Sequence, residues 1–161
     1  MRLSATDSNP SEMEIRFLDT SVIIRHLTQD HPEHSMRARQ IFLQVERGDL
    51  VVMTCEGVLV EVVQVLSSPR LYHLARLEIC RLLSQLLSLP GLKLSNKRAY
   101  LQALERYAAS TLDFVDCLEV AHMERLRIDT IVSFDRDFDK IAGVTRLKLE
   151  ELSLDQYEEA R

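Results

Sequence analysis

The stretch RFLDTSVIIRHL, residues 16–27, contains the transition that decides the fold of this chain. Its first apolar residues run directly into Asp19, and apolar residues then resume at helical spacing. We therefore predict a short buried strand over residues 15–18 and a helix that begins at Thr20 or Ser21. An acidic residue at such a junction either caps the helix or belongs to a site at the end of the strand.

The composition indicates one folded, helix-rich domain. The chain has 161 residues, of which 46% are hydrophobic and 28% charged, and this is enough for a substantial core. Only four Gly and four Pro residues occur, and neither GxxxxGK[ST] nor GxGxxG is present, which excludes the common phosphate loops. The net charge of −5 counts against a nucleic-acid binder, unless acidic residues gather around a bound cation.

No apolar run is long enough to span a membrane, and residues 1–13 lack the apolar segment of a signal peptide. We expect a polar tail over residues 1–13, a domain over residues 14–149 and a second tail over residues 150–161. The cysteines are odd in number and show neither zinc nor disulfide spacing, so we expect buried thiols in a reducing cytoplasm. They are Cys55, Cys80 and Cys117.

Strand-like and helix-like runs alternate along the chain. Because the strand-like runs are apolar throughout, this order favours an α/β fold, a three-layer α/β/α arrangement around a central parallel sheet. Ligands of such folds bind beyond the carboxyl ends of the strands. The predicted strands are residues 15–18, 50–54, 92–94, 129–134 and 145–149, and the predicted helices are residues 20–27, 32–47, 55–68, 74–88, 97–109 and 113–127, with a single turn over 135–141.

Several acidic residues lie where helices begin. Asp19, Asp113 and Asp135 each precede a predicted helix or turn, and Asp suits the N-cap position. Asp116 falls in a first helical turn, where the helix dipole favours negative charge. Glu61 differs, because its helix is apolar on nearly every side, so it either reaches the surface or needs a partner.

Capping does not explain why these acids converge. In a parallel sheet Asp19 and Asp135 leave strands at the same edge, and the helix that Asp116 opens should begin there too. Carboxylates packed together repel one another unless some are protonated or a cation binds. Oxygen ligands without His or Cys suit Mg²⁺ or Mn²⁺, and such clusters support metal-assisted phosphodiester cleavage.

Four stretches of the chain resemble, in order, the four acidic motifs of the PIN domain, and the closest likeness is to the VapC-type toxin ribonucleases. The similarity covers residues 15–149. The stretches are FLDTSVIIRHL, VLVEVVQVL, DFVDCLEVAHM and SFDRDFDKI.

The resemblance implies a ribonuclease that depends on Mg²⁺ or Mn²⁺, contains a central parallel sheet and leaves a 5′-phosphate and a 3′-hydroxyl. It also implies RNA as substrate, a cognate antitoxin as partner and a homodimer. The implied acids of the metal site are Asp19, Glu61, Asp116 and Asp135, with Thr20, Ser21, Asp113 and Ser133 as accessory residues.

We therefore predict a cytoplasmic, metal-dependent endoribonuclease of single-stranded RNA that serves as the toxin of a toxin–antitoxin pair. In this mechanism Glu61 orients or deprotonates the attacking water. The alternative is a non-catalytic PIN-like module that binds RNA or protein, against which the intact acid set argues. A phosphotransfer domain fits less well, because the second residue after Asp19 is Ser21 and not the acid of a DxD motif.

Overall fold

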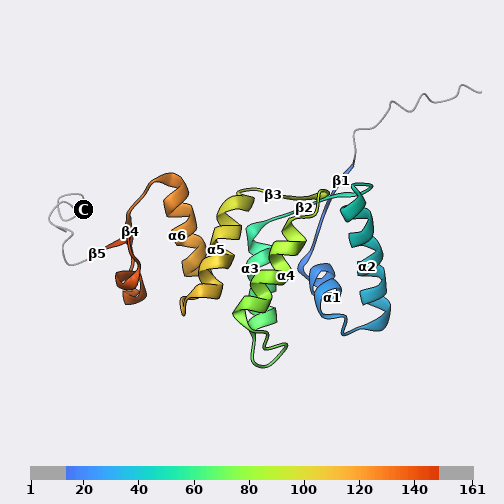
Figure 1. Ribbon diagram of the computed structural model, residues 1–161, viewed down its shortest axis with the longest axis horizontal. Coiled ribbons are helices and arrows are strands. Elements are labelled where there is room, and N and C mark those ends of the chain that lie inside the picture. Colours follow the sequence, from blue (N-terminus) through green and yellow to red (C-terminus); the bar gives the residue numbers. More distant parts are fainter. Residues whose placement is uncertain (1–13, 149–161) are drawn as a thin grey trace, which may run out of the picture. The chain divides into compact units, whose positions relative to one another are not determined.

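The computed structural model describes residues 14–148 as a mixed α/β protein with parallel strands flanked by helices, which confirms the predicted fold class (Figure 1). The chain divides into two compact units, with the boundary between Lys97 and Arg98. Each unit is described by itself. The predicted tails, and the predicted strand end at Leu149, lie outside the described residues.

The elements follow the predicted order. The first unit contains three strands and four helices: β1 (Ile15–Phe17), α1 (Thr20–Thr28), α2 (Pro32–Arg47), β2 (Val51–Thr54), α3 (Glu56–Ser67), α4 (Arg76–Leu87) and β3 (Leu92–Leu94). The helix α5 (Lys97–Ala109) begins at the boundary, and the second unit continues with α6 (Phe114–Leu126), β4 (Thr130–Val132), the 3₁₀ helix η1 (Arg136–Lys140) and β5 (Thr145–Leu147). The helix predicted over residues 55–68 forms as α3, despite its many β-branched residues.

The strand β2 is the centre of the first sheet, with β1 and β3 parallel to it on either side. Phe17 pairs with Met53, and Met53 pairs with Lys93. The pairing continues beyond β1, because the Leu18 amide donates to the Met53 carbonyl at 2.7 Å and the buried Thr54 hydroxyl donates to the Leu18 carbonyl at 3.1 Å. The backbone directly before Asp19 is therefore fixed to β2.

Helices pack on this sheet through apolar faces. The helix α1 contacts both α2 and α3, and α3 contacts α4. Removing large aliphatic side chains from water stabilises the unit by about 1.5–3 kcal/mol for each one. The fully buried ones include Ile23, Val45, Leu59, Val62, Leu66, Ile79 and Leu83.

The second unit has its own small core. Phe114, the first residue of α6, meets the rings of Tyr100 and Tyr107 edge to face, at centroid distances of 5.2 and 5.5 Å. The strands β4 and β5 are parallel, and Phe138 of η1 is buried. Arg146 of β5 binds Asp139 through two hydrogen bonds of 2.9 Å, which ties η1 to the sheet.

Two of the strands predicted to be buried are exposed. Ile15 and Phe17 of β1 are 55% and 65% exposed, and Val132 of β4 is 63% exposed. The strand β1 is an edge of the three-stranded sheet, and β4 belongs to a sheet of two strands. The apolar composition of a strand does not show whether a further layer covers it, which is why this prediction was wrong.

The cysteine prediction was also wrong in part. Cys117 is buried, but Cys80 is only half-buried and Cys55 is exposed. Cys55 occupies the N-cap position of α3, outside the helix itself, where its side chain makes no capping hydrogen bond. None of the three forms a disulfide with another described residue. Among the described residues, no helix has the length and apolar character to cross a membrane.

Gly91, in the turn before β3, provides a test of the packing. A Cβ atom there would lie 2.3 Å from the Leu50 carbonyl oxygen and 2.6 Å from the Val45 carbonyl oxygen, whereas one at Gly57 would only touch the Cys55 sulfur at 3.8 Å. We expect Gly91→Ala to lower the free energy of unfolding by about 2 kcal/mol or more. The control Gly57→Ala, in the first turn of α3, should raise it by about 0.5 kcal/mol. Urea denaturation measures both, and equal effects would contradict the packing described.

Candidate active site

Asp19 caps α1 and remains charged. Its Oδ2 accepts hydrogen bonds from the Ser21 hydroxyl at 2.7 Å and from the Ser21 amide at 3.1 Å. These bonds, the hydroxyl first, lower the pKa of the exposed Asp19 carboxyl. The capping role predicted for Asp19 is thus confirmed, and it keeps a charged carboxylate at the end of β1.

Thr20 connects Asp19 to the second predicted acid. The Thr20 side chain is almost fully buried, and its hydroxyl donates to Oε2 of Glu61 at 2.5 Å. Glu61 itself is exposed, like Gln64 one turn later, while Leu59 and Val62 of the same helix are buried. Glu61 therefore reaches the surface and also has a hydrogen-bond partner, so both expectations from the sequence apply to it.

A cavity of about 310 Å³ joins these residues. Asp19, Ser21 and Glu61 supply its acidic and hydroxyl groups, and Arg25 supplies a cation. The first unit thus brings the first and second predicted acids to one cavity. The remaining lining residues are Thr20, Ile24, Val65, Leu71 and Tyr72.

A polar cluster that no sequence pattern indicates extends from this cavity to Asp30. Arg25 donates to both carboxylate oxygens of Asp30 at 2.6 and 2.7 Å, and the Tyr72 hydroxyl donates to Asp30 at 2.5 Å. The Tyr72 bond first, and then the Arg25 bonds, hold the pKa of Asp30 well below its usual range. The three residues come from α1 and from two loops that are distant in sequence, so no local pattern could have revealed the cluster.

In the second unit the capping predictions for Asp113 and Asp135 are confirmed. Asp113 accepts a hydrogen bond from the Val115 amide at 2.9 Å at the start of α6. Asp135 accepts one from the Asp137 amide at 2.8 Å at the start of η1. The Ser133 hydroxyl accepts from the Asp135 amide at 3.0 Å, which fixes the backbone that carries this acid.

The surroundings of Asp116 disfavour the ionised form of its carboxyl group. Burial first, and then the charges of Asp113 and Asp135, raise the pKa of the Asp116 carboxyl, with smaller contributions from Glu119 and Asp137. Burial and the charges of these neighbours all oppose ionisation of the Asp116 carboxyl. A hard divalent cation would relieve this repulsion, and the oxygen-only donor set fits Mg²⁺ or Mn²⁺.

The predicted acids therefore fall into two pairs. Asp19 and Glu61 belong to the first unit, and Asp116 and Asp135 belong to the second. Within either unit, the described residues contain no group of three or more His, Cys, Asp or Glu side chains placed to hold a metal ion. The convergence of all four acids on one metal site stays a prediction.

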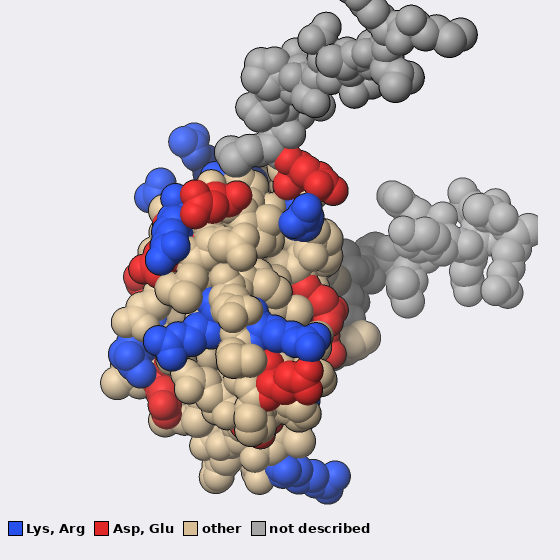
Figure 2. Space-filling view, turned by 90° about the vertical axis from the view of Figure 1, so that its right-hand side faces the viewer, with Lys and Arg blue, Asp and Glu red and all other residues tan. Residues whose placement is uncertain are grey.

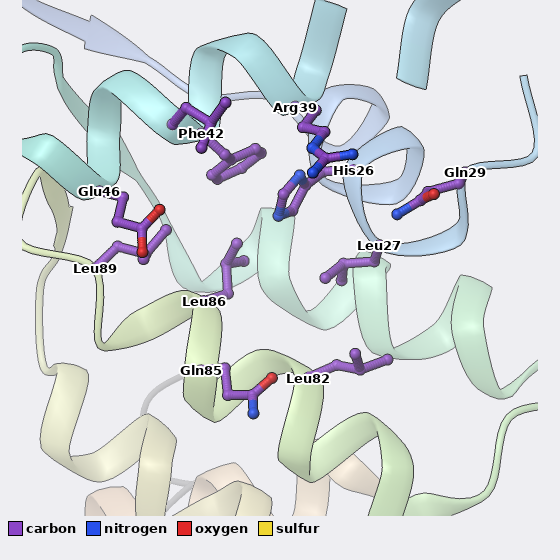
Figure 3. Close-up of a pocket in the computed structure, with 11 residues that line it drawn as sticks. His26, Leu27, Gln29, Arg39, Phe42, Glu46, Leu82, Gln85, Leu86 and Leu89 are labelled. Carbon is purple, nitrogen blue, oxygen red and sulfur yellow. The ribbon is translucent and has the colours of Figure 1, made fainter. Parts of the chain in front are cut away.

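A separate cavity of about 350 Å³ lies between α1, α2 and α4 (Figure 3). His26 packs against Phe42 there at a ring-centroid distance of 4.1 Å, and burial, followed by the charge of Arg39, lowers the His26 pKa. The remaining lining residues are five leucines with Gln29, Glu46 and Gln85, and none of the predicted site residues is among them. On the face drawn in Figure 2, Lys and Arg are interspersed with Asp and Glu, so this face has no large field of a single sign.

Comparison with known proteins identifies the family. The PIN domain family model matches residues 16–144. Among solved structures, the chain is similar to the Mycobacterium tuberculosis VapC20 toxin, described as cleaving the sarcin-ricin loop, with 23% identity over 82% of this chain and 97% of that chain and a TM-score of 0.35. No curated protein sequence matches the chain.

The Thr20–Glu61 bond can be tested by stability. Thr20→Val keeps the shape of the side chain but removes the hydroxyl donor, so we expect the free energy of unfolding to fall by about 1 kcal/mol. Thr20→Ser keeps the donor and should lose less. Urea denaturation measures both variants, and a Val variant as stable as wild type would show that the bond contributes nothing.

The raised pKa of Asp116 predicts a pH-dependent gain from its removal. The folded-state pKa lies above the unfolded value, so ionisation of Asp116 costs stability, and the cost is present at neutral pH and absent below about pH 4. In the absence of metal, Asp116→Asn should therefore raise the free energy of unfolding at pH 7 by less than about 1 kcal/mol, and the melting temperature should rise with it. Near pH 3 the substitution should have no effect.

Asp19→Asn is the matched control for this prediction, because the Asp19 pKa is lowered and its ionised form is the stabilised one. That variant should not gain stability at pH 7. Thermal denaturation across the pH range in EDTA measures both variants. A gain for Asp19→Asn equal to that for Asp116→Asn would contradict the opposite electrostatics of the two sites.

Proposed function

Because the chain belongs to the PIN domain family, we propose that it is a metal-dependent endoribonuclease that hydrolyses phosphodiester bonds of single-stranded RNA. The observation that carries the proposal is the environment of Asp116, whose carboxyl lies half-buried among other acids that oppose its ionisation. Gathering carboxylates in this way costs stability unless a cation binds there. In a non-catalytic module nothing would offset this cost.

We propose that Asp19, Asp116 and Asp135 hold one or two Mg²⁺ or Mn²⁺ ions. When bound, such ions lower the pKa of a water molecule and neutralise the charge that develops on the phosphate. Capping keeps the first and third of these ligands at fixed positions, since Ser21 holds Asp19 and the Asp137 amide holds Asp135. Asp113, which caps α6, positions the helix that carries Asp116.

Glu61 is proposed to orient the attacking water or accept its proton. Thr20 donates to Oε2 of Glu61, and no hydrogen bond of the described residues occupies Oε1. One carboxylate oxygen is therefore fixed, and the other can accept a hydrogen bond from water. Thr20 acts through Glu61 and is a positioning residue.

The toxin role, a cognate antitoxin as partner, a cytoplasmic location and a homodimer belong to the same proposal, supported by the likeness of the motifs to the VapC-type toxins. The helix α4 has apolar residues outside its buried face, such as Leu77, which is 73% exposed. An exposed apolar surface of this kind supports the proposed homodimer. Light scattering at micromolar concentration distinguishes a homodimer from a monomer.

The cleavage prediction has an ordered set of outcomes. The protein should cleave single-stranded RNA with Mg²⁺ or Mn²⁺ and be inactive in EDTA. Asp19→Asn and Asp116→Asn should abolish cleavage, since each removes an anionic ligand. Glu61→Gln should lower the cleavage rate but keep more metal affinity than the Asp19 and Asp116 variants. Asp113→Asn should be the mildest, because Asn also caps helices well.

Gel assays with a labelled RNA measure the activity, and the shift of melting temperature with added metal measures binding. Asp49→Asn, at an exposed acid between α2 and β2, is a control that should leave both unchanged. Metal-independent cleavage, or an Asp116→Asn variant as active as wild type, would refute the mechanism and favour the non-catalytic module.

A further inference from the structure

The cavity that contains Asp19 and Glu61 also has an apolar part that the proposed chemistry does not use. Leu71 and Tyr72, in the loop between α3 and α4, line it together with Ile24 and Val65. Leu71 is 63% exposed, although it is a large apolar side chain. An uncovered apolar residue beside a half-buried aromatic ring, in the same cavity as predicted catalytic acids, is a candidate binding surface.

This loop is held in one conformation by its own hydrogen bonds. The amides of Leu71 and His73 both donate to the Ser68 carbonyl at 3.0 Å, and the Leu74 amide donates to the Leu66 carbonyl at 2.9 Å. The Tyr72 hydroxyl is in addition bound to Asp30, which Arg25 binds from α1. A platform built this way is ordered before any ligand arrives, so binding to it loses little conformational freedom.

The chemistry of the cavity matches one nucleotide. Single-stranded nucleic acids bind through stacking of bases on aromatic side chains, combined with cations that contact the backbone. Tyr72 offers the ring and Leu71 an apolar neighbour. Arg25 donates to Asp30 through Nη1, and its guanidinium also interacts with Tyr72, so the cation lies beside the ring. A volume of about 310 Å³ is at the low end for binding sites of small molecules.

We propose that Tyr72 and Leu71 form a base-binding subsite, on which the nucleotide next to the scissile phosphate packs its base while Arg25 contacts the RNA backbone. The inference rests on the proposed nuclease function. A base can reach such a platform only when it is unstacked from its neighbours, so the subsite selects single strands, loops and bulges over duplexes. Specificity for single-stranded RNA then follows from a feature of the first unit.

The test uses the full chain and a short single-stranded RNA with 2-aminopurine at one position in turn. Stacking on Tyr72 should quench the fluorescence of one position when protein is added in EDTA. Tyr72→Ala should remove the quenching and raise KM in the Mn²⁺ cleavage assay by about 5- to 100-fold, with kcat little changed. Leu71→Ala should show a smaller rise in KM.

Two control variants separate stacking from folding. Tyr72→Phe keeps the ring but loses the bond to Asp30, so it should keep the quenching. Met36→Ala removes an apolar side chain of α2 that is 58% exposed and does not line the cavity, so it should behave like wild type. Circular dichroism confirms that each variant is folded.

The outcomes distinguish the subsite from the nuclease. If wild type cleaves RNA and Tyr72→Ala keeps both quenching and KM, the subsite is refuted, the nuclease stands, and the exposed loop is better assigned to a protein partner. If wild type shows quenching that depends on Tyr72 but no cleavage with either metal, the subsite stands and the nuclease is refuted. If it shows neither, both are refuted.

Discussion

The hydrogen bond from the Leu18 amide to the Met53 carbonyl is the contact on which the candidate site of the first unit depends. It extends the parallel pairing of β1 and β2 one residue beyond β1, and the Thr54 hydroxyl returns a bond to the Leu18 carbonyl. The chain therefore enters α1 from a fixed point. Because α1 and α3 both begin shortly after paired strands, Thr20 at the start of α1 reaches Glu61 in the second turn of α3. The geometry of the sheet thus decides which side chains can meet.

Capping and metal binding are not competing explanations for these acids. A capping carboxylate is oriented by backbone amides and keeps its charge, and these are properties that a ligand for a hard cation also needs. Asp19 illustrates this, since Ser21 lowers its pKa while holding it in place. Asp116 is different, because it caps nothing and its neighbours oppose its charge. An acid without a structural role and with an unfavourable environment is the stronger sign of function.

Most of the fold could be predicted from sequence because the local signals agree. Pro32 and Gly48 mark the ends of α2, and its buried residues recur at helical spacing. Burial of the strands could not be predicted, since an apolar strand can have the same sequence pattern at the edge of a sheet as at its centre. Asp30 and Tyr72 were missed for a related reason: they meet only through tertiary structure, and neither lies in a periodic segment. The capping roles of Asp19, Asp113 and Asp135 were predicted from sequence, whereas the metal site of the acids stays a prediction.

The exposed strand β1 has a consequence for solubility. Ile15 and Phe17 present apolar surface at the edge of the sheet, which is the kind of strand that recruits strands from other molecules. Arg16 lies between them and forms an ion pair of 3.1 Å with Glu14. A charge in this position makes edge-to-edge assembly unfavourable, because a second molecule would have to bury it. Arg16 therefore acts as a gatekeeper against aggregation, and its replacement by an apolar residue would leave a continuous apolar strand open to association.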